Sequence, residues 1–80
     1  MSHRVTLLTR AGCHLCVAAR EAMERVAAAT GVAWREVDVD TDDELAMEYG
    51  DRLPVVLLDG AEHGYWKVEE RRLIRDLERR

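Results

Sequence analysis

Apolar positions along the chain form short continuous runs that alternate with stretches of helical spacing, and this pattern predicts a mixed α/β fold. Runs rich in β-branched and other apolar residues, together with a segment after a tight-turn signal, predict strands over residues 4–9, 32–39, 55–58 and 61–67. Apolar residues at helical spacing predict a helix from Cys13 to residue 30, with its main body at 17–30, and further helices over 42–49 and 69–80. The predicted order is therefore β-α-β-α-β-β-α.

Cap and turn signals set the ends of these elements. Gly31 follows the first helix at the position where a left-handed residue commonly ends a helix. Thr41-Asp42-Asp43-Glu44 has the form of a capping box, with acidic residues at the positive end of the second helix. Asp59-Gly60 directly follows a buried strand and predicts a two-residue hairpin.

These elements predict a four-stranded mixed sheet with helices on both faces. The first two strands are joined through a helix and should be parallel, with a right-handed crossover, whereas the hairpin strands should be antiparallel. We expect Trp34 in the core, and inner helix faces formed by Leu45, Ala46 and either Met47 or Tyr49, and by Leu73, Ile74 and Leu77. A chain of 80 residues leaves no room for a second core, so residues 1–80 are predicted to form a single domain.

Composition narrows the classes of function. The chain is 48% hydrophobic and 35% charged, which is typical of a folded globular protein. Its net charge of −4 disfavours a nucleic-acid partner, since phosphate neutralisation requires a basic face. No apolar run approaches the length of a membrane span, and Met1-Ser2-His3-Arg4 leads into a strand without an apolar signal region. We therefore expect a cytoplasmic monomer with neither a membrane nor a nucleic-acid partner.

The candidate chemistry lies in the segment between the first strand and the first helix, which contains both cysteines of the chain. Cys13 and Cys16 are separated by two residues. In a reducing compartment such a pair is more typical of a catalytic or metal-binding site than of a structural staple. A bridge across two residues would also constrain little of the unfolded chain.

Three features would make this pair active in thiol chemistry. Cys13 at a helix N-terminus, with Arg10 nearby, should have a lowered pKa, because unpaired amides and a cation stabilise the thiolate. Cys16, one turn later, is placed to resolve a mixed disulfide. Leu53-Pro54 could offer a backbone edge to a substrate disulfide if its peptide bond is cis, which we take as a hypothesis.

Other interpretations of the same residues remain open. The cysteines could be inert core residues, or zinc ligands helped by His14 and His63, although two thiolates supply only half of a tetrahedral site. An iron–sulfur cluster shared across a dimer is a further alternative. We expect no metal site, and we interpret His3 and His63 as surface residues. His14 could tune the thiolate or simply face solvent, and Arg10 could be functional or a solvated loop charge.

The chain resembles the glutaredoxin-like proteins of the thioredoxin superfamily, and more narrowly the small bacterial members long treated as a domain of unknown function. The resemblance rests on Thr-Arg-x-Gly-Cys-x-Leu-Cys after the first strand, on Leu-Pro-Val-Val, on Asp-Gly, and on Gly-x-Trp before the last helix. It implies a thioredoxin-like (glutaredoxin-type) three-layer α/β/α sandwich and a dithiol–disulfide oxidoreductase with Cys13 as nucleophile and Cys16 as resolving thiol. It also implies that Arg10 helps to hold glutathione and that Leu53, before Pro54, bonds the backbone of the glutathione cysteine.

Two departures from this family concern the glutathione site. His14-Leu15 stands where dithiol glutaredoxins have Pro-Tyr, and Gly64 is followed by Tyr65-Trp66 instead of a second glycine and an aspartate. The predicted substrate-binding residues are those of the loop, the proline and the last strand: Arg10, Gly12, His14, Leu53, Pro54 and Gly64. Thioredoxin's buried acid is also absent from the first strand.

The resemblance implies protein disulfides or glutathione mixed disulfides as substrates. Glutathione or a thioredoxin-reductase-type flavoenzyme is the expected reductant, and we expect no tightly bound cofactor. A different class of function stays open: a non-catalytic module whose cysteines sense redox state or bind a metal.

Overall fold

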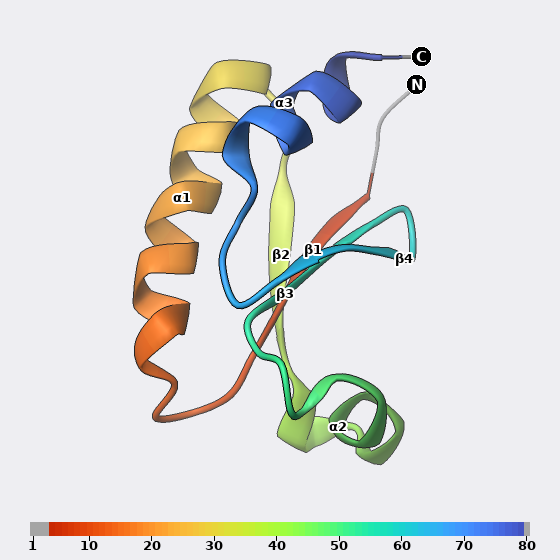
Figure 1. Cartoon of the computed structure of the whole chain (residues 1–80). Coiled ribbons are helices and arrows are strands. Elements are labelled where there is room, and N and C mark those ends of the chain that lie inside the picture. Colours follow the sequence, from red (N-terminus) through yellow and green to blue (C-terminus); the bar gives the residue numbers. More distant parts are fainter. Residues whose placement is uncertain (1–3, 80) are drawn as a thin grey trace.

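The computed structural model describes residues 4–79, and over this range the chain has the predicted element order. The elements are β1 (Val5–Thr9), α1 (His14–Thr30), β2 (Trp34–Asp38), a 3₁₀ turn η1 (Val39–Thr41), α2 (Asp43–Tyr49), β3 (Val55–Leu58), β4 (Ala61–Tyr65) and α3 (Glu70–Glu78) (Figure 1). The strand predicted over 55–58 matches β3. The predicted ends at residues 9, 30 and 49 and the predicted start at residue 61 also coincide, and the remaining ends differ by one or two residues. The expectations for Met1-Ser2-His3 and for the last helical residue, Arg80, lie outside the described residues.

The four strands form one mixed sheet in the order β2-β1-β3-β4. β1 runs parallel to β2 and antiparallel to β3, and β3 runs antiparallel to β4. The hairpin between the last two strands turns at Asp59 and Gly60, whose φ values are 53° and 87°. Positive φ at both positions is the backbone form that matches the twist of hairpin strands, so the Asp-Gly prediction is confirmed.

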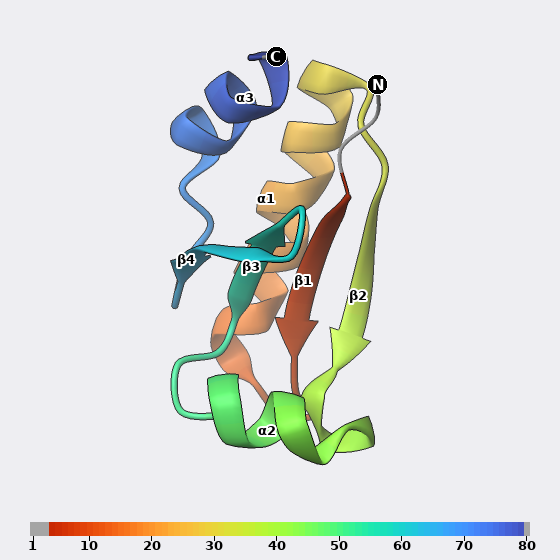
Figure 2. The same cartoon turned by 90° about the vertical axis from the view of Figure 1, so that its right-hand side faces the viewer.

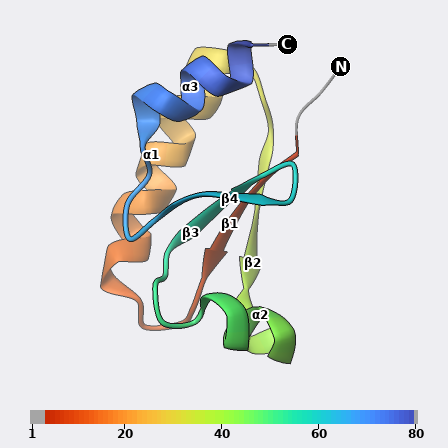
Figure 3. The same ribbon diagram turned by 45° about the vertical axis from the view of Figure 1, so that its right-hand side comes forward.

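Helices cover the two faces of the sheet unequally. In Figures 1 and 2, α1 and α3 lie together on one face, while α2 lies at one end of the sheet. Figure 3 shows α2 at the opposite end of the molecule from α3. Successive strand residues point to opposite faces, so Leu7 packs with α1 and α3 and its neighbour Leu8 packs on the side of α2. The two resulting clusters flank β1, which is buried along its whole length.

The cluster under α1 and α3 is the larger one. Its buried residues are Val5, Leu7, Ala19, Ala22, Met23, Val26, Val56, Val68, Leu73 and Leu77. Ile74 and Trp34 pack against it but are only partly buried. The inner face predicted for the last helix is therefore confirmed, whereas Trp34 lies at the margin of the core, because β2 is an edge strand.

The start of α2 differs from the predicted capping box. Asp42 is the N-cap, and its Oδ1 accepts from the amides of Glu44 and Leu45 at 3.0 and 3.3 Å. Thr41 belongs to the preceding 3₁₀ turn, where its hydroxyl donates to the carbonyl of Asp38 at 2.7 Å. The prediction that Thr41 opens the capping box was wrong because Asp38 caps this extra turn and moves the start of the helix by one residue.

The inner face of α2 selects between the two predicted alternatives. Leu45, Ala46 and Tyr49 pack, partly buried, against the smaller cluster of Leu8, Val39 and Val55. Met47 is 87% exposed. Tyr49 rather than Met47 therefore faces the core.

Within residues 4–79, no helix has both the length and the apolar character needed to cross a membrane.

Candidate dithiol site

Cys13 and Cys16 are joined by a disulfide at the start of α1, with their Cα atoms 5.3 Å apart. Cys13 is the N-cap residue, and α1 begins at His14. The amide of Cys13 donates to the carbonyl of Arg10 at 3.2 Å, which closes a tight turn ahead of the helix. Gly12 adopts a φ of 79° in this turn, a left-handed conformation that glycine reaches without the Cβ penalty of other residues.

The two sulfurs of this pair differ in exposure. Cys16 is 0% exposed, whereas Cys13 is half-buried and its neighbours His14 and Leu15 are exposed. The first turn of α1 carries no acidic residue whose negative charge would offset the positive end of the helix dipole. This arrangement leaves Cys13 as the sulfur that a substrate can reach, at a position that favours an anion.

The peptide bond between Leu53 and Pro54 is cis. Val55 pairs with Leu8, near the end of β1. Pro54 therefore lies at the edge of the sheet from which the loop of residues 10–13, called here the dithiol loop, leaves β1. The carbonyl of Pro54 accepts from the amide of Trp66 at 2.8 Å, which brings the end of β4 to the same edge. The cis form proposed from the sequence is therefore present, at the edge of the sheet where the loop that leads to Cys13 begins.

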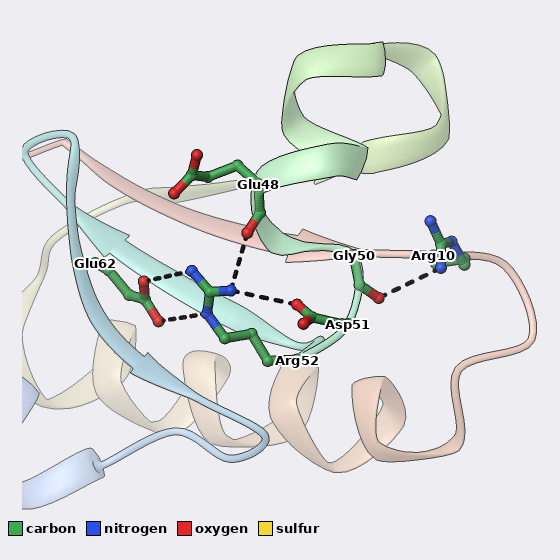
Figure 4. A network of polar contacts seen from close by, with 6 residues as sticks. All are labelled: Arg10, Glu48, Gly50, Asp51, Arg52 and Glu62. Carbon is green, nitrogen blue, oxygen red and sulfur yellow. Dashed lines mark hydrogen bonds and ion pairs between the residues drawn. The ribbon is translucent and has the colours of Figure 1, made fainter.

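Arg10 is engaged within the chain. Its Nε lies 3.1 Å from both carboxylate oxygens of Asp40, and its Nη1 donates to the carbonyl of Gly50 at 3.4 Å. Figure 4 shows this side chain reaching from the dithiol loop toward the end of α2. Arg10 thus ties the loop to η1 and α2, and its predicted contact with glutathione stays a prediction.

A second arginine anchors the segment that precedes the cis bond. The guanidinium of Arg52 makes two bonds of 3.0 Å to Glu62 on β4 and one of 2.9 Å to the carbonyl of Glu48 (Figure 4). It also lies 5.2 Å from the ring centre of Tyr49. The hydrogen bond from Arg52 lowers the pKa of the Glu62 carboxyl. No local sequence pattern indicates this cluster, because its members come from α2, from the segment after it and from β4.

A third network lies between α1 and β2, one turn beyond Cys16. Arg20 donates twice to Glu36 at 2.8 Å, and the hydroxyl of Thr9 donates to the same carboxylate at 2.7 Å. The bond from Arg20 lowers the pKa of Glu36, and the bond from Thr9 adds to the effect. Because this carboxylate is held ionised, it acts as a brace between three elements at the end of β1.

His63 was expected at the surface, and this expectation was wrong. Its side chain is only 7% exposed, and its Nε2 lies 2.9 Å from Asp76 on α3. Arg72, also on α3, donates to the carbonyl of His63. The contacts of His63 with α3 bury its side chain, and the sequence pattern did not specify them. The bond to His63 lowers the pKa of Asp76.

No side chains gather as a metal site: within residues 4–79, no group of three or more histidine, cysteine, aspartate or glutamate side chains could hold a metal ion.

A surface groove of about 760 Å³ extends along β4 and the segment leading to α3. It is lined by Leu15, Glu62, His63, Gly64, Tyr65, Trp66, Lys67, Glu69 and Arg72. The structure therefore places Gly64 in the same groove as Leu15, the residue next to Cys16. Among the other predicted binding residues, Arg10 bonds to Asp40 and Gly50, and Leu53 packs, partly buried, against the smaller core cluster.

The arginine-paired carboxylates predict how stability depends on pH. Hydrogen bonds from Arg20, Arg52 and Arg25 lower the pKa values of Glu36, Glu62 and Glu70 from their ordinary value of 4.5. Because each pKa is lower in the folded than in the unfolded chain, the stabilisation is complete above the unfolded pKa and is lost as pH falls through the folded pKa. We expect the melting temperature of the oxidised protein to fall by several degrees on acidification below about pH 4.5.

Thermal unfolding from about pH 7 to about pH 3 measures this dependence. Glu62→Gln should start from a lower melting temperature and should lose less on acidification. A melting temperature that stays constant or rises over the acidic range would contradict the assignment of these ion pairs.

Comparisons with known proteins agree with this geometry. The family model described as "Glutaredoxin-like domain (DUF836)" matches residues 4–78. Uncharacterized proteins of Mycobacterium tuberculosis and Mycobacterium bovis are 47% identical over 81 residues, covering 95% of this chain and 84% of each relative.

Solved structures show the same fold. A structural-genomics target from X. campestris is 34% identical, with a TM-score of 0.73 and coverage of 92% of this chain and 95% of that one. The glutaredoxin-like NrdH-redoxin of Escherichia coli is 26% identical, with a TM-score of 0.64 and coverage of 96% and 97%. Protein Ne2328 of Nitrosomonas europaea superposes with a TM-score of 0.85 at 19% identity, covering 98% and 94% of the two chains. The chain belongs to the glutaredoxin-like domain family and has the thioredoxin fold, with its Cys13–Cys16 pair as a disulfide.

Proposed function

We propose that this protein is a thiol–disulfide oxidoreductase that cycles the Cys13–Cys16 pair between dithiol and disulfide. The observation that carries the proposal is the disulfide itself, placed at the start of α1 with Cys13 accessible and Cys16 buried. This asymmetry gives the two thiols different roles: one meets the substrate, and the other acts only after the substrate is attached.

The proposed reaction is two successive exchanges. The Cys13 thiolate attacks one sulfur of a substrate disulfide, so a Cys13–substrate bond forms, the substrate bond breaks, and the leaving thiolate takes up a proton. The Cys16 thiolate then attacks the Cys13 sulfur, which restores the Cys13–Cys16 disulfide and releases the second substrate thiol. Two electrons pass to the substrate, and an external reductant must return them to the protein.

The substrates in this proposal are protein disulfides or glutathione mixed disulfides, and the reductant is glutathione or a thioredoxin-reductase-type flavoenzyme. The engagement of Arg10 by Asp40 and Gly50 weighs toward the flavoenzyme, since it occupies the cation that the resemblance assigns to glutathione. The glutaredoxin-like NrdH-redoxin of E. coli has a thioredoxin-like activity profile. A glutaredoxin-like chain with thioredoxin-like activity therefore has a precedent in this fold.

Equilibration with glutathione redox buffers tests the proposal. We expect a reversible two-electron transition with a midpoint between roughly −180 and −270 mV, the range of redoxins. The oxidised and reduced forms can be counted by thiol alkylation and mass spectrometry. A coupled assay with NADPH, run once with glutathione and glutathione reductase and once with a thioredoxin reductase, then identifies the donor. Absence of turnover with both systems would contradict an oxidoreductase and favour the non-catalytic sensor.

A further inference from the structure

Large apolar side chains are exposed next to the disulfide. Leu15, Tyr65 and Trp66 are 54%, 47% and 57% exposed, and all three line the groove along β4. We call these three residues the apolar platform. Leu15 stands between the two cysteines, and Tyr65 pairs with Val55 directly after the cis-proline. The platform therefore includes a residue of the first turn of α1, which carries the disulfide, and a residue paired with the strand that follows the cis-proline.

Trp66 has an unusual backbone for its residue type. Its φ of 68° lies in the left-handed region, which non-glycine residues rarely adopt. Its amide is fixed by the bond to the Pro54 carbonyl, and its ring meets Tyr65 edge-on with centroids 5.0 Å apart. More than half of the side chain is exposed, so burial does not compensate for the backbone conformation. A glycine would suit this backbone better, which points to a use for the indole outside the fold.

The charges around the groove do not select an anion. Arg72 donates to the carbonyl of His63, and Glu62 is bound by Arg52. The other two charged residues of the lining, Lys67 and Glu69, have opposite signs. A peptide with two carboxylates, such as glutathione, finds no net positive charge here, whereas an uncharged apolar side chain finds three apolar surfaces.

We propose, resting on the oxidoreductase function above, that the apolar platform binds a large apolar or aromatic side chain next to the reacting cysteine of a polypeptide substrate. Trp66 is the specificity-determining residue. The occupant is an extended substrate segment whose sulfur bonds to Cys13 while its neighbouring side chain lies in the groove. Burial of one such side chain against a partly open surface should raise kcat/KM by roughly tenfold.

The test uses two short peptides, each closed by a disulfide and differing only in having Trp or Ser beside the reacting cysteine. Reduced protein is mixed with excess peptide, and the rate of oxidation is followed to saturation. Wild type should prefer the Trp peptide by roughly tenfold in the second-order rate constant of oxidation, through a lower half-saturating peptide concentration rather than a higher limiting rate. Trp66→Ala should bring this preference close to one. Met47→Ala, a change at an exposed apolar residue on α2, away from the groove, should keep it.

A second variant separates recognition from folding. Trp66→Gly should melt at a higher temperature than Trp66→Ala, because glycine adopts the left-handed backbone freely, yet it should lose the preference to the same extent. Equal rates for the two peptides with wild type, or a preference retained in both Trp66 variants, would overturn the inference. Hydroxyethyl disulfide serves as a small substrate: if wild type reduces it but does not discriminate between the peptides, the inference alone fails. If wild type reduces no disulfide at all, the proposed function fails as well.

Discussion

Replacement of Cys13 by Ser is expected to abolish disulfide reduction, by roughly three orders of magnitude or more. A serine hydroxyl remains protonated at neutral pH and cannot attack a disulfide, so no mixed disulfide forms. The coupled assay with the active donor system measures this loss. Val17→Ser is the matched control. Val17 is an exposed residue directly after Cys16 on α1, so this substitution should leave the activity unchanged.

The physical reason for the size of this effect is the position of Cys13. It caps α1, its neighbours are exposed, and Cys16 is buried, so no second thiol is available to take its place. The thiolate of reduced wild type should also titrate below the ~8.5 of a free cysteine, as seen in its ultraviolet absorbance. Retention of activity in Cys13→Ser would contradict the proposed role directly.

Local sequence signals predicted most of the architecture. Gly31 ends α1 with a φ of 75°, and Asp59-Gly60 forms the hairpin turn, as these residue types indicate. Both features depend on the backbone preferences of one or two residues, and residue type alone indicates these preferences. The dithiol pair and its helix end were predictable for the same reason.

The arginine–carboxylate pairs around the site, which we call the braces, could not be predicted, because they join residues that are far apart in the chain. Arg10 and Asp40 are 30 positions apart, and Arg20 and Glu36 are 16 apart. A charge pattern does not say which of several carboxylates an arginine meets until the register of the strands is known. The burial of His63 likewise depends on its contacts with Arg72 and Asp76 of α3, which no local pattern contains.

These braces give the short helix α2 a structural role at the site. Arg10 joins its C-terminal end to the dithiol loop, and Arg52 joins the following segment to β4. The two contacts fix both chain segments that flank the cis-proline edge. These polar contacts therefore help to position the loop before Cys13 relative to the cis-proline edge.

Replacement of Cys16 by Ser is expected to stop the reaction halfway. Cys13 can still attack a substrate disulfide, but no resolving thiol follows, so the protein should accumulate as a mixed disulfide with its substrate. Serine is close to cysteine in size and Cys16 is fully buried, so the variant should fold with a modest loss of stability. Mass spectrometry of the covalent adduct measures the outcome, and the double variant Cys13→Ser/Cys16→Ser should form none.

The choice of reductant decides what this variant does at steady state. With a thioredoxin-reductase-type flavoenzyme, turnover on a protein disulfide should fall by roughly a hundredfold or more, because release of the trapped substrate requires the second thiol. With glutathione, an external thiolate could attack the mixed disulfide in place of Cys16, and turnover on glutathione mixed disulfides would persist. The guanidinium of Arg10 is already bound by Asp40, and the positive and negative side chains that line the groove are equal in number. Both observations favour the first result. Full turnover on protein disulfides without Cys16 would contradict the dithiol mechanism, since the buried sulfur would then have no part in releasing the substrate.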